Sequence, residues 1–176
     1  FFLKNAKLLK IVNCQIVNTM SIRSYITENR ARFMEEWASL IRIPSISCQP
    51  AHKDDMLRCA ERWRELLLEA GAQHAEVMPS AGNPFVYAEY SPNSLIASNI
   101  PTVLVYSHYD VMPVEPLDLW HSNPWEPAIR DGRLYARGAD DDKGQAMIQV
   151  KAFEYLVHEG LMNCRVKFIF GGEEEI

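Results

Sequence analysis

Residues 102–111 read TVLVYSHYDV and place a continuous apolar run directly before two side chains that can bind a metal ion. The apolar run, at residues 103–106, is typical of a strand that is buried on both faces of a sheet. A second run of this kind, VKFIF at residues 166–170, follows a helical pattern over residues 143–159. Two central strands with a helix between them predict an α/β sandwich.

Further elements surround this unit. Apolar side chains recur at helical spacing after Ser21, a capping residue, and again before Gly71, a residue type that commonly ends helices. Turn-bounded stretches predict short strands and a hairpin. In chain order, these elements are a helix from Ser21 to before Pro44, a helix from about Asp54 to Gly71, strands at residues 74–78 and 85–90, and a hairpin around Asp131-Gly132.

The length and composition are those of one folded domain. The chain has 176 residues, of which 48% are hydrophobic and 23% charged, a balance typical of globular proteins. Eighteen Lys and Arg residues against 23 Asp and Glu residues give a net charge of −5. Proteins that bind nucleic-acid phosphates or anionic lipid headgroups need the opposite charge, so we expect neither nucleic acid nor a membrane as partner.

The first 19 residues contain apolar side chains interrupted by lysines, and the first methionine is Met20. No run there approaches the roughly 20 apolar residues of a membrane span. We expect residues 1–19 to be an upstream or poorly structured segment and residues 20–176 to form the domain. The cysteines form no CxxC pair, so we expect reduced thiols in a cytoplasmic protein. They are Cys14, Cys48, Cys59 and Cys164.

Three clusters of potential metal ligands follow predicted strands or loops. They are His108 with Asp110, the run Asp140 to Asp142, and the run Glu173 to Glu175. Taken singly, each has an ordinary interpretation: a hydrogen-bonded histidine, aspartates that cap a helix, and solvated glutamates. Taken together, imidazole and carboxylate groups are the ligand set of zinc or a related divalent ion. The three clusters therefore predict a metal site.

Two longer stretches carry a resemblance to a known family. SHYDVMPVEPLDLWHSNPWEPAIRDGRLYARGADDDKGQ at residues 107–145 and FGGEEEI at residues 170–176 closely resemble the co-catalytic zinc metallopeptidases. This family includes carnosine dipeptidase, cytosolic non-specific dipeptidase, glutamate carboxypeptidase, acetylornithine deacetylase and succinyl-diaminopimelate desuccinylase. The resemblance implies a catalytic domain that is a three-layer α/β sandwich, with a central mixed sheet flanked by helices.

Matched motif by motif, the resemblance implies a role for each of five residues. His108 would bind one zinc ion, and Asp110 would orient that histidine. Asp141 would bridge two zinc ions. Glu174 would be the general base, and Glu175 would be a ligand of the second zinc ion.

The other acidic residues carry different implications. The resemblance implies a cis peptide bond between Asp141 and Asp142. Asp140 and Glu173 match no assigned role, so we expect them to contribute only to the local electrostatics. The D-D-K-G pattern that includes Asp142 is similar to the dipeptidase branch of the family, whereas the deacetylase branch more often has D-M-K-G.

The expected reaction is hydrolysis of a peptide bond in dipeptides or small peptides, with two Zn²⁺ ions, or Mn²⁺ or Co²⁺ in their place. A hydroxide between two cations about 3.5–4 Å apart is nucleophilic at neutral pH, and a carboxylate that binds no metal can transfer the proton. The alternatives are an N-acyl amino acid amidohydrolase and a non-catalytic binding protein on the same fold. A magnesium site for phosphoryl groups is disfavoured because the sequence has no P-loop.

The resemblance also implies features that these 176 residues do not carry. They are further downstream ligands, namely a carboxylate and a histidine, and a smaller inserted domain that closes over the substrate and often mediates dimerisation. We therefore expect the chain to be incomplete, to hold zinc poorly and to be inactive alone, and the full-length protein to form a homodimer.

Overall fold

The structure, a computed structural model, describes residues 20–92 and 100–176. The expectation for residues 1–19 falls outside the described residues. In chain order the elements are α1 (Ile22–Ile41), the 3-10 turn η1 (Pro50–His52), α2 (Lys53–Glu69), β1 (His74–Met78), β2 (Phe85–Tyr90), β3 (Thr102–His108), the 3-10 turn η2 (Leu117–Leu119), β4 (Ala128–Arg130), β5 (Arg133–Tyr135), α3 (Lys143–His158) and β6 (Arg165–Gly171).

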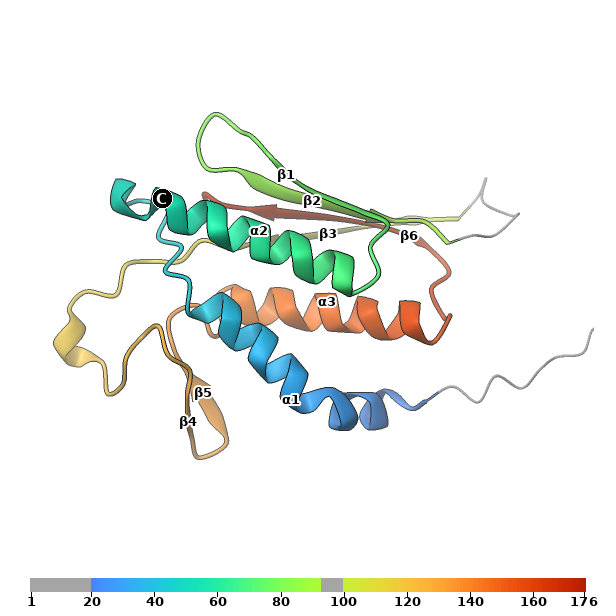
Figure 1. Cartoon of the computed structure of the whole chain (residues 1–176), viewed down its shortest axis with the longest axis horizontal. Coiled ribbons are helices and arrows are strands. Elements are labelled where there is room, and N and C mark those ends of the chain that lie inside the picture. Colours follow the sequence, from blue (N-terminus) through green and yellow to red (C-terminus); the bar gives the residue numbers. More distant parts are fainter. Residues whose placement is uncertain (1–19, 93–99) are drawn as a thin grey trace, which may run out of the picture.

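Four of the strands form one mixed sheet in the order β1-β2-β6-β3. The pairs β1–β2 and β2–β6 are antiparallel, and β3 is parallel to β6. The connection between the two parallel strands contains α3, as the sequence predicted. Figure 1 shows the helices gathered on one side of this sheet. The α/β class and the mixed sheet with flanking helices are confirmed, and the described residues supply the sheet and one helical layer.

The core lies between the sheet and its helical layer. The buried side chains of α2 recur at spacings of three and four residues, so that one stripe of the helix faces the sheet. The Trp63 ring stands edge-on against Phe170 of β6, with 4.9 Å between the ring centroids. Helix α3 completes this core with Val150 and Phe153. The sequence pattern and the packing therefore agree in this part of the molecule.

A buried ionic cluster joins α1 to α3. Lys151 of α3 pairs with Glu36 of α1 and lies 2.6 Å from Glu154. Glu154 in turn pairs with Arg32 and accepts a hydrogen bond of 2.7 Å from the Tyr25 hydroxyl. Each carboxylate thus has a cationic partner, which is what a buried charge requires.

The prediction that residues 103–106 are buried on both faces is wrong for the described structure. Leu104 and Tyr106 are each 61% exposed, and Val103 is 45% exposed. Within the described residues, β3 lies at the edge of the sheet and pairs only with β6. Alternate side chains of β3 point away from the helical layer, so an apolar run alone did not distinguish an edge strand from a central one.

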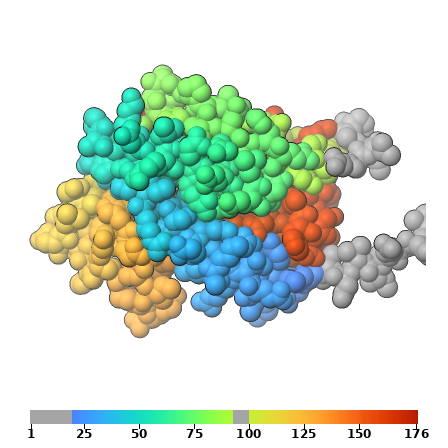
Figure 2. All heavy atoms as spheres, in the orientation of Figure 1, coloured from blue at the N-terminus to red at the C-terminus, as the bar shows by residue number. Residues whose placement is uncertain are grey.

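The hairpin and the loop before it project from one end of the molecule. The turn residues Asp131 and Gly132 have φ values of 49° and 75°, the left-handed geometry that a two-residue hairpin needs. Figure 2 shows this region, in yellow and orange, as a lobe beside the helices. No helix in the described ranges has the length and apolar character needed to cross a membrane.

Candidate metal centre

The three clusters of potential ligands meet where β3, β6 and α3 converge. His108, the last residue of β3, is in register with the last residue of β6, so the two parallel strands end at the same edge. Asp110 follows the first strand, and residues 173–175 follow the second. Helix α3 begins directly after residues 140–142. The fold therefore brings the clusters to the carboxyl edge of the sheet, where open α/β sheets bind ligands.

The closest group consists of His108, Asp141 and Asp142. One ligand atom from each lies within 4.8 Å of the other two. The His108 Nε2 atom is 3.1 Å from the Asp141 Oδ1 atom, and the His108 backbone N–H donates to Asp142 Oδ2 at 3.1 Å. The peptide bond between Asp141 and Asp142 is cis, as expected. The imidazole and the two carboxylates are thus close enough to one another to surround a divalent ion.

Asp110 is the organising residue of the centre. Its carboxylate is fully buried and accepts the backbone N–H groups of Glu174 at 3.2 Å and Glu175 at 2.9 Å. Its Oδ1 atom is 3.4 Å from His108 Nδ1, and its backbone carbonyl is 3.2 Å from the same nitrogen. With Nδ1 facing Asp110, the opposite nitrogen of His108 is left for a metal ion. Asp110 therefore links the histidine to the glutamate run.

The two glutamates predicted to act in the reaction lie at the rim. The Glu174 Oε2 atom is 3.9 Å from His108 Nε2, and its side chain is 51% exposed. The close group of three ligands does not include Glu175. Partial burial, followed by the charges of Asp141 and Glu174, raises the pKa of Glu175. Negative charge is therefore crowded here, and a bound cation would relieve the repulsion.

His108 carries the compensating charge when no metal is bound. Burial by itself lowers the pKa of the imidazole, but the hydrogen bond and charge of Asp110, with the charges of Asp142 and Glu174, raise it to about 9. A histidine with Nδ1 fixed, and with the carboxylates of Asp141 and Glu174 near Nε2, fits zinc. The residues present therefore fit a divalent metal ion on chemical grounds.

Metal binding should release a proton from His108. Below a pKa of about 9 the ring is protonated, and it must lose the Nε2 proton before it can coordinate. At about pH 7.5 we expect about one proton from this ring per ion bound, and an apparent Zn²⁺ affinity that rises about tenfold per pH unit until the pH reaches the pKa. Calorimetry of the full-length protein in two buffers of different ionisation enthalpy measures the release.

A matched control for this measurement is the exposed histidine at position 121. His121→Ala should leave the proton release and its pH dependence unchanged. His108→Ala should abolish tight binding. Proton release that is unaffected in the His108 variant would exclude this ring as the ligand.

Asp140 and Glu173 lie outside the close group of ligands. Asp140 is exposed and lines a groove between α1 and α3. The Glu173 carboxylate accepts the Asn83 backbone N–H at 3.0 Å. It also lies in the space that a Cβ atom at Gly82 would take, so a larger residue at position 82 would displace the Glu173 carboxylate. Glu173 therefore has a specific contact with the β1–β2 loop, which its assignment to local electrostatics did not include.

Sequence reasoning missed a buried residue that packs beside the glutamate run of the centre. Tyr109 is fully buried, and its hydroxyl donates to the Pro84 carbonyl at 2.6 Å. Its ring leaves no room for a side chain at Gly172, next to the glutamate run. Tyr109 follows the end of β3, and its neighbours His108 and Asp110 are buried as well, so alternation along the chain gave no signal for its burial or its partner. Asp142 was visible in the aspartate run, although no signal there indicated its bond to His108.

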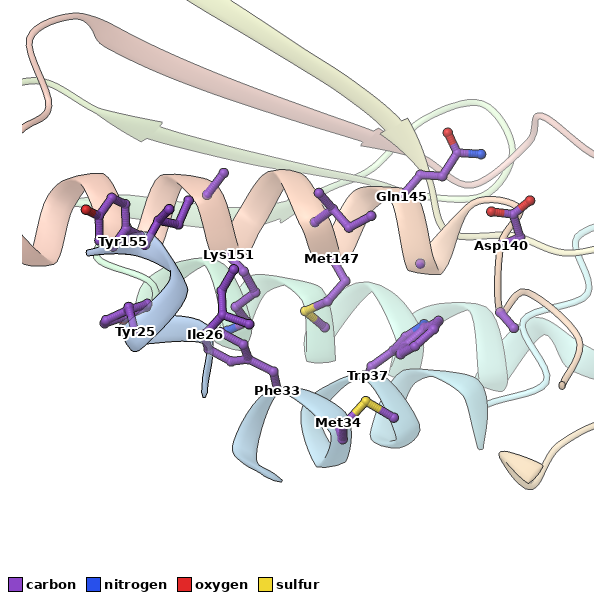
Figure 3. Close-up of a pocket in the computed structure, with 15 residues that line it drawn as sticks. Tyr25, Ile26, Phe33, Met34, Trp37, Asp140, Gln145, Met147, Lys151 and Tyr155 are labelled. Atoms are coloured by element: carbon purple, nitrogen blue, oxygen red, sulfur yellow. The ribbon is translucent and has the colours of Figure 1, made fainter. Parts of the chain in front are cut away.

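The apolar groove between α1 and α3 is separate from the metal centre. It encloses about 390 Å³ and is lined mainly by apolar side chains, with Asp140 and Gln145 at one end. Figure 3 shows Phe33, Met34 and Trp37 of α1 facing Met147 and Lys151 of α3 across it. None of the four residues His108, Asp141, Asp142 and Glu174 lines this groove.

The stretch of chain that contains this centre is similar to known proteins. Residues 104–176 match the profile of peptidase family M20/M25/M40. The cysteinylglycine-S-conjugate dipeptidase of Corynebacterium striatum is 31% identical over 152 residues, which are 86% of this chain and 32% of that protein.

Two solved structures share the fold. Human carnosine dipeptidase 1 superposes with a TM-score of 0.73 at 26% identity, over 86% of this chain and 34% of its own. The M20 family metallo-carboxypeptidase Sso-CP2 of Sulfolobus solfataricus superposes with a TM-score of 0.71 at 32% identity, over 81% of this chain and 31% of its own. The chain thus spans about a third of the length of these proteins. The stretch that matches peptidase family M20/M25/M40, residues 104–176, contains every residue of the candidate metal centre.

Proposed function

We propose that the protein is a metal-dependent peptidase that hydrolyses the peptide bond of dipeptides or small peptides with the help of two Zn²⁺ ions. The observation that carries this proposal is the convergence of His108, Asp141 and Asp142 within 4.8 Å, with Glu174 beside them. All four lie in the stretch that matches a peptidase family. Residues 20–176 would be the N-terminal portion of the catalytic domain.

The ligands would be His108, Asp141 and Glu175. Asp141 would be shared between the two ions, and its exposed carboxylate points to Nε2 of His108. Asp142 already accepts the His108 backbone N–H through Oδ2, so we assign it to holding the histidine. When bound, the two metal ions lower the pKa of water and polarise the carbonyl of the substrate.

Glu174 would transfer the proton. The Glu174 backbone N–H donates to Asp110, but its carboxylate is half exposed, and within the described residues its nearest cationic partner is His108 at 3.9 Å. A carboxylate held in this way can accept a proton from the attacking water and return it to the departing amine. Glu175, one residue on, has its backbone fixed by the second oxygen of Asp110. The same buried residue therefore sets the positions of both the base and the neighbouring ligand.

The preferred substrate would be a dipeptide. The D-D-K-G pattern supports this choice, as do two of the similar proteins, which are dipeptidases. N-acyl amino acids are the second candidate class. We further propose a cytoplasmic location, from the absence of paired cysteines in the sequence, and we expect no nucleic-acid or membrane partner.

Substrate and metal dependence test this proposal in the full-length protein. The substrates would be a panel of free dipeptides and the matching amino acids with an acetyl or succinyl group on nitrogen. We expect dipeptides to give the higher kcat/KM by at least roughly tenfold, a transition-state difference of about 1.4 kcal/mol. A chelator should abolish the activity, and added Zn²⁺, Mn²⁺ or Co²⁺ should restore it.

Each other outcome identifies a different function. Faster turnover of the N-acyl substrates would establish the amidohydrolase alternative. Tight metal binding without hydrolysis of either panel would favour a binding protein on the same fold. Activity that survives complete removal of the metal would overturn the proposed mechanism.

A further inference from the structure

Lys143 follows Asp141 and Asp142 directly, and its side chain is fully buried. Its Nζ atom donates to the backbone carbonyls of Leu40 at 2.9 Å and Ile43 at 2.8 Å. Both acceptors are neutral peptide groups rather than carboxylates. Burying an amine among neutral partners is costly, and a methionine would fill a similar volume without that cost. The contacts of Lys143 therefore call for a role beyond packing.

The two acceptors lie at the end of α1 and in the turn after it. The last carbonyls of a helix have no partner within the helix and carry partial negative charge. The final turn of α1 contains no basic residue of its own. The Leu40 carbonyl accepts the Ile43 backbone N–H at 3.1 Å, and Lys143 adds a cationic donor from 103 positions along the chain. It thereby ties the start of α3 to the end of α1.

Ser45 continues this connection from the turn to the metal centre. The Ile43 carbonyl that accepts from Lys143 also accepts the Ser45 backbone N–H at 2.9 Å. The buried Ser45 hydroxyl donates to the Tyr109 carbonyl at 2.7 Å, and the Ser45 carbonyl accepts the Val111 N–H at 2.9 Å. Ser45 therefore holds the chain on both sides of the residue between Tyr109 and Val111, which is Asp110.

The side chain of Lys143 also packs beside the same segment. At Gly138, a Cβ atom would come within 2.8 Å of the Val111 side chain and 3.2 Å of the Lys143 side chain. Both side chains therefore meet over one glycine, which has a positive φ of 74°. Hydrogen bonds and packing therefore connect Lys143, the turn at residues 40–45 and the segment at residues 108–111.

We propose that Lys143 is a positioning residue of the metal centre, which holds the segment of Asp141 and Asp142 at a fixed distance from the segment of His108 and Asp110. The inference rests on the proposed metal function. Lys143 touches neither metal nor substrate; it acts through Ser45 on the backbone of Asp110. Loss of its hydrogen bonds should loosen the centre even where the fold persists.

The test compares Lys143→Met with Lys151→Met in the full-length protein. Lys151 lies about two turns further along the same helix, is also buried, and pairs with Glu36 and Glu154. Figure 3 shows it on the groove side of α3, pointing to α1. The readouts are the melting temperature, the affinity for Co²⁺ alone measured by competition with a chelator, and the absorption spectrum of the bound Co²⁺.

We expect both variants to melt at lower temperature, but only Lys143→Met to lose metal affinity, by about 10- to 100-fold, as for other residues that orient metal ligands. Its Co²⁺ spectrum should shift, because the ligand geometry changes, whereas the Lys151→Met spectrum should match that of the unsubstituted protein. Co²⁺ affinity of Lys143→Met within twofold of the unsubstituted protein would overturn the inference.

Ser45→Ala keeps the test decisive if Lys143→Met does not fold. It removes only the hydroxyl that donates to the Tyr109 carbonyl. We expect a loss of Co²⁺ affinity of at least roughly threefold. Ser39→Ala is the matched control, since the Ser39 hydroxyl donates to the Glu36 carbonyl within α1 and accepts the Arg62 Nε–H of α2, and neither partner belongs to the metal centre. Unchanged affinity in Ser45→Ala would overturn the inference. An unsubstituted protein that binds no Co²⁺ would instead overturn the proposed function.

Discussion

Replacing Glu174 with glutamine in the full-length protein should lower kcat for dipeptides by roughly 10²- to 10⁴-fold while the metal content stays unchanged. Glutamine keeps the size and the hydrogen-bonding shape of the side chain but cannot accept and return a proton. The half-exposed Glu174 carboxylate lies 3.9 Å from the proposed ligand atom of His108. Removing its charge should therefore leave His108 and Asp141 in place. Steady-state kinetics and metal analysis of the same preparation measure the two effects.

Glu173→Gln is the matched control for this experiment. It makes the same chemical change one residue earlier, and the remaining oxygen can still accept the Asn83 N–H. We expect its kcat to stay within a few-fold of the unsubstituted protein, since a neutral hydrogen bond to backbone is worth only about 1 kcal/mol. Substantial hydrolysis by Glu174→Gln, or an equal loss in both variants, would remove Glu174 from the role of general base.

Asp110→Asn should weaken metal binding by about 10- to 100-fold and destabilise the fold by about 1–3 kcal/mol. Three nitrogen groups surround the carboxylate beside the Ser47 hydroxyl: the N–H groups of Glu174 and Glu175, and Nδ1 of His108. An amide offers one oxygen and one NH₂ group, so at least one buried N–H would face another donor. His108 would also lose the negative charge that fixes its orientation. Chelator competition and thermal unfolding of the full-length protein measure these losses.

Asp140→Asn is the control for Asp110→Asn. Asp140 is exposed and lies outside the close group of ligands, so its replacement should change neither metal affinity nor stability by a measurable amount. Normal metal affinity in Asp110→Asn would show that the buried carboxylate does not organise the centre. A loss of affinity in Asp140→Asn as large as in Asp110→Asn would show that general negative charge, rather than specific contacts, attracts the metal.

Much of the fold could be predicted because its signals are local. The cap at Ser21 and the stop at Gly71 set helix ends, and both are explained by interactions within a few residues. The hairpin at Asp131-Gly132 follows from the backbone conformation that these two residues tolerate. The exposure of β3 could not be predicted in this way. It depends on which elements lie beside the strand, and an apolar run carries no information about them.

The candidate site was predictable in kind but not in its contacts. The histidine and the two acidic runs were visible as metal-type ligands from residue type alone. Their convergence required the parallel register of β3 with β6, which joins residues 63 positions apart, from Thr102–Arg165 to His108–Gly171. The specific contact of Glu173 with the β1–β2 loop joins residues 90 positions apart. Spacing along a sequence cannot show such a contact.

The sequence by itself determined the helices, most strands, the acidic character and the set of residues that can bind metal, because each depends on side-chain chemistry or on short-range periodicity. Tertiary structure alone decided which of those residues share a site. It also decided that Asp110 holds the glutamate run, and that Lys143 donates to α1 across 103 positions. The physical reason is that hydrogen bonds and ion pairs act over a few ångströms, and only the packed chain brings distant residues within that range.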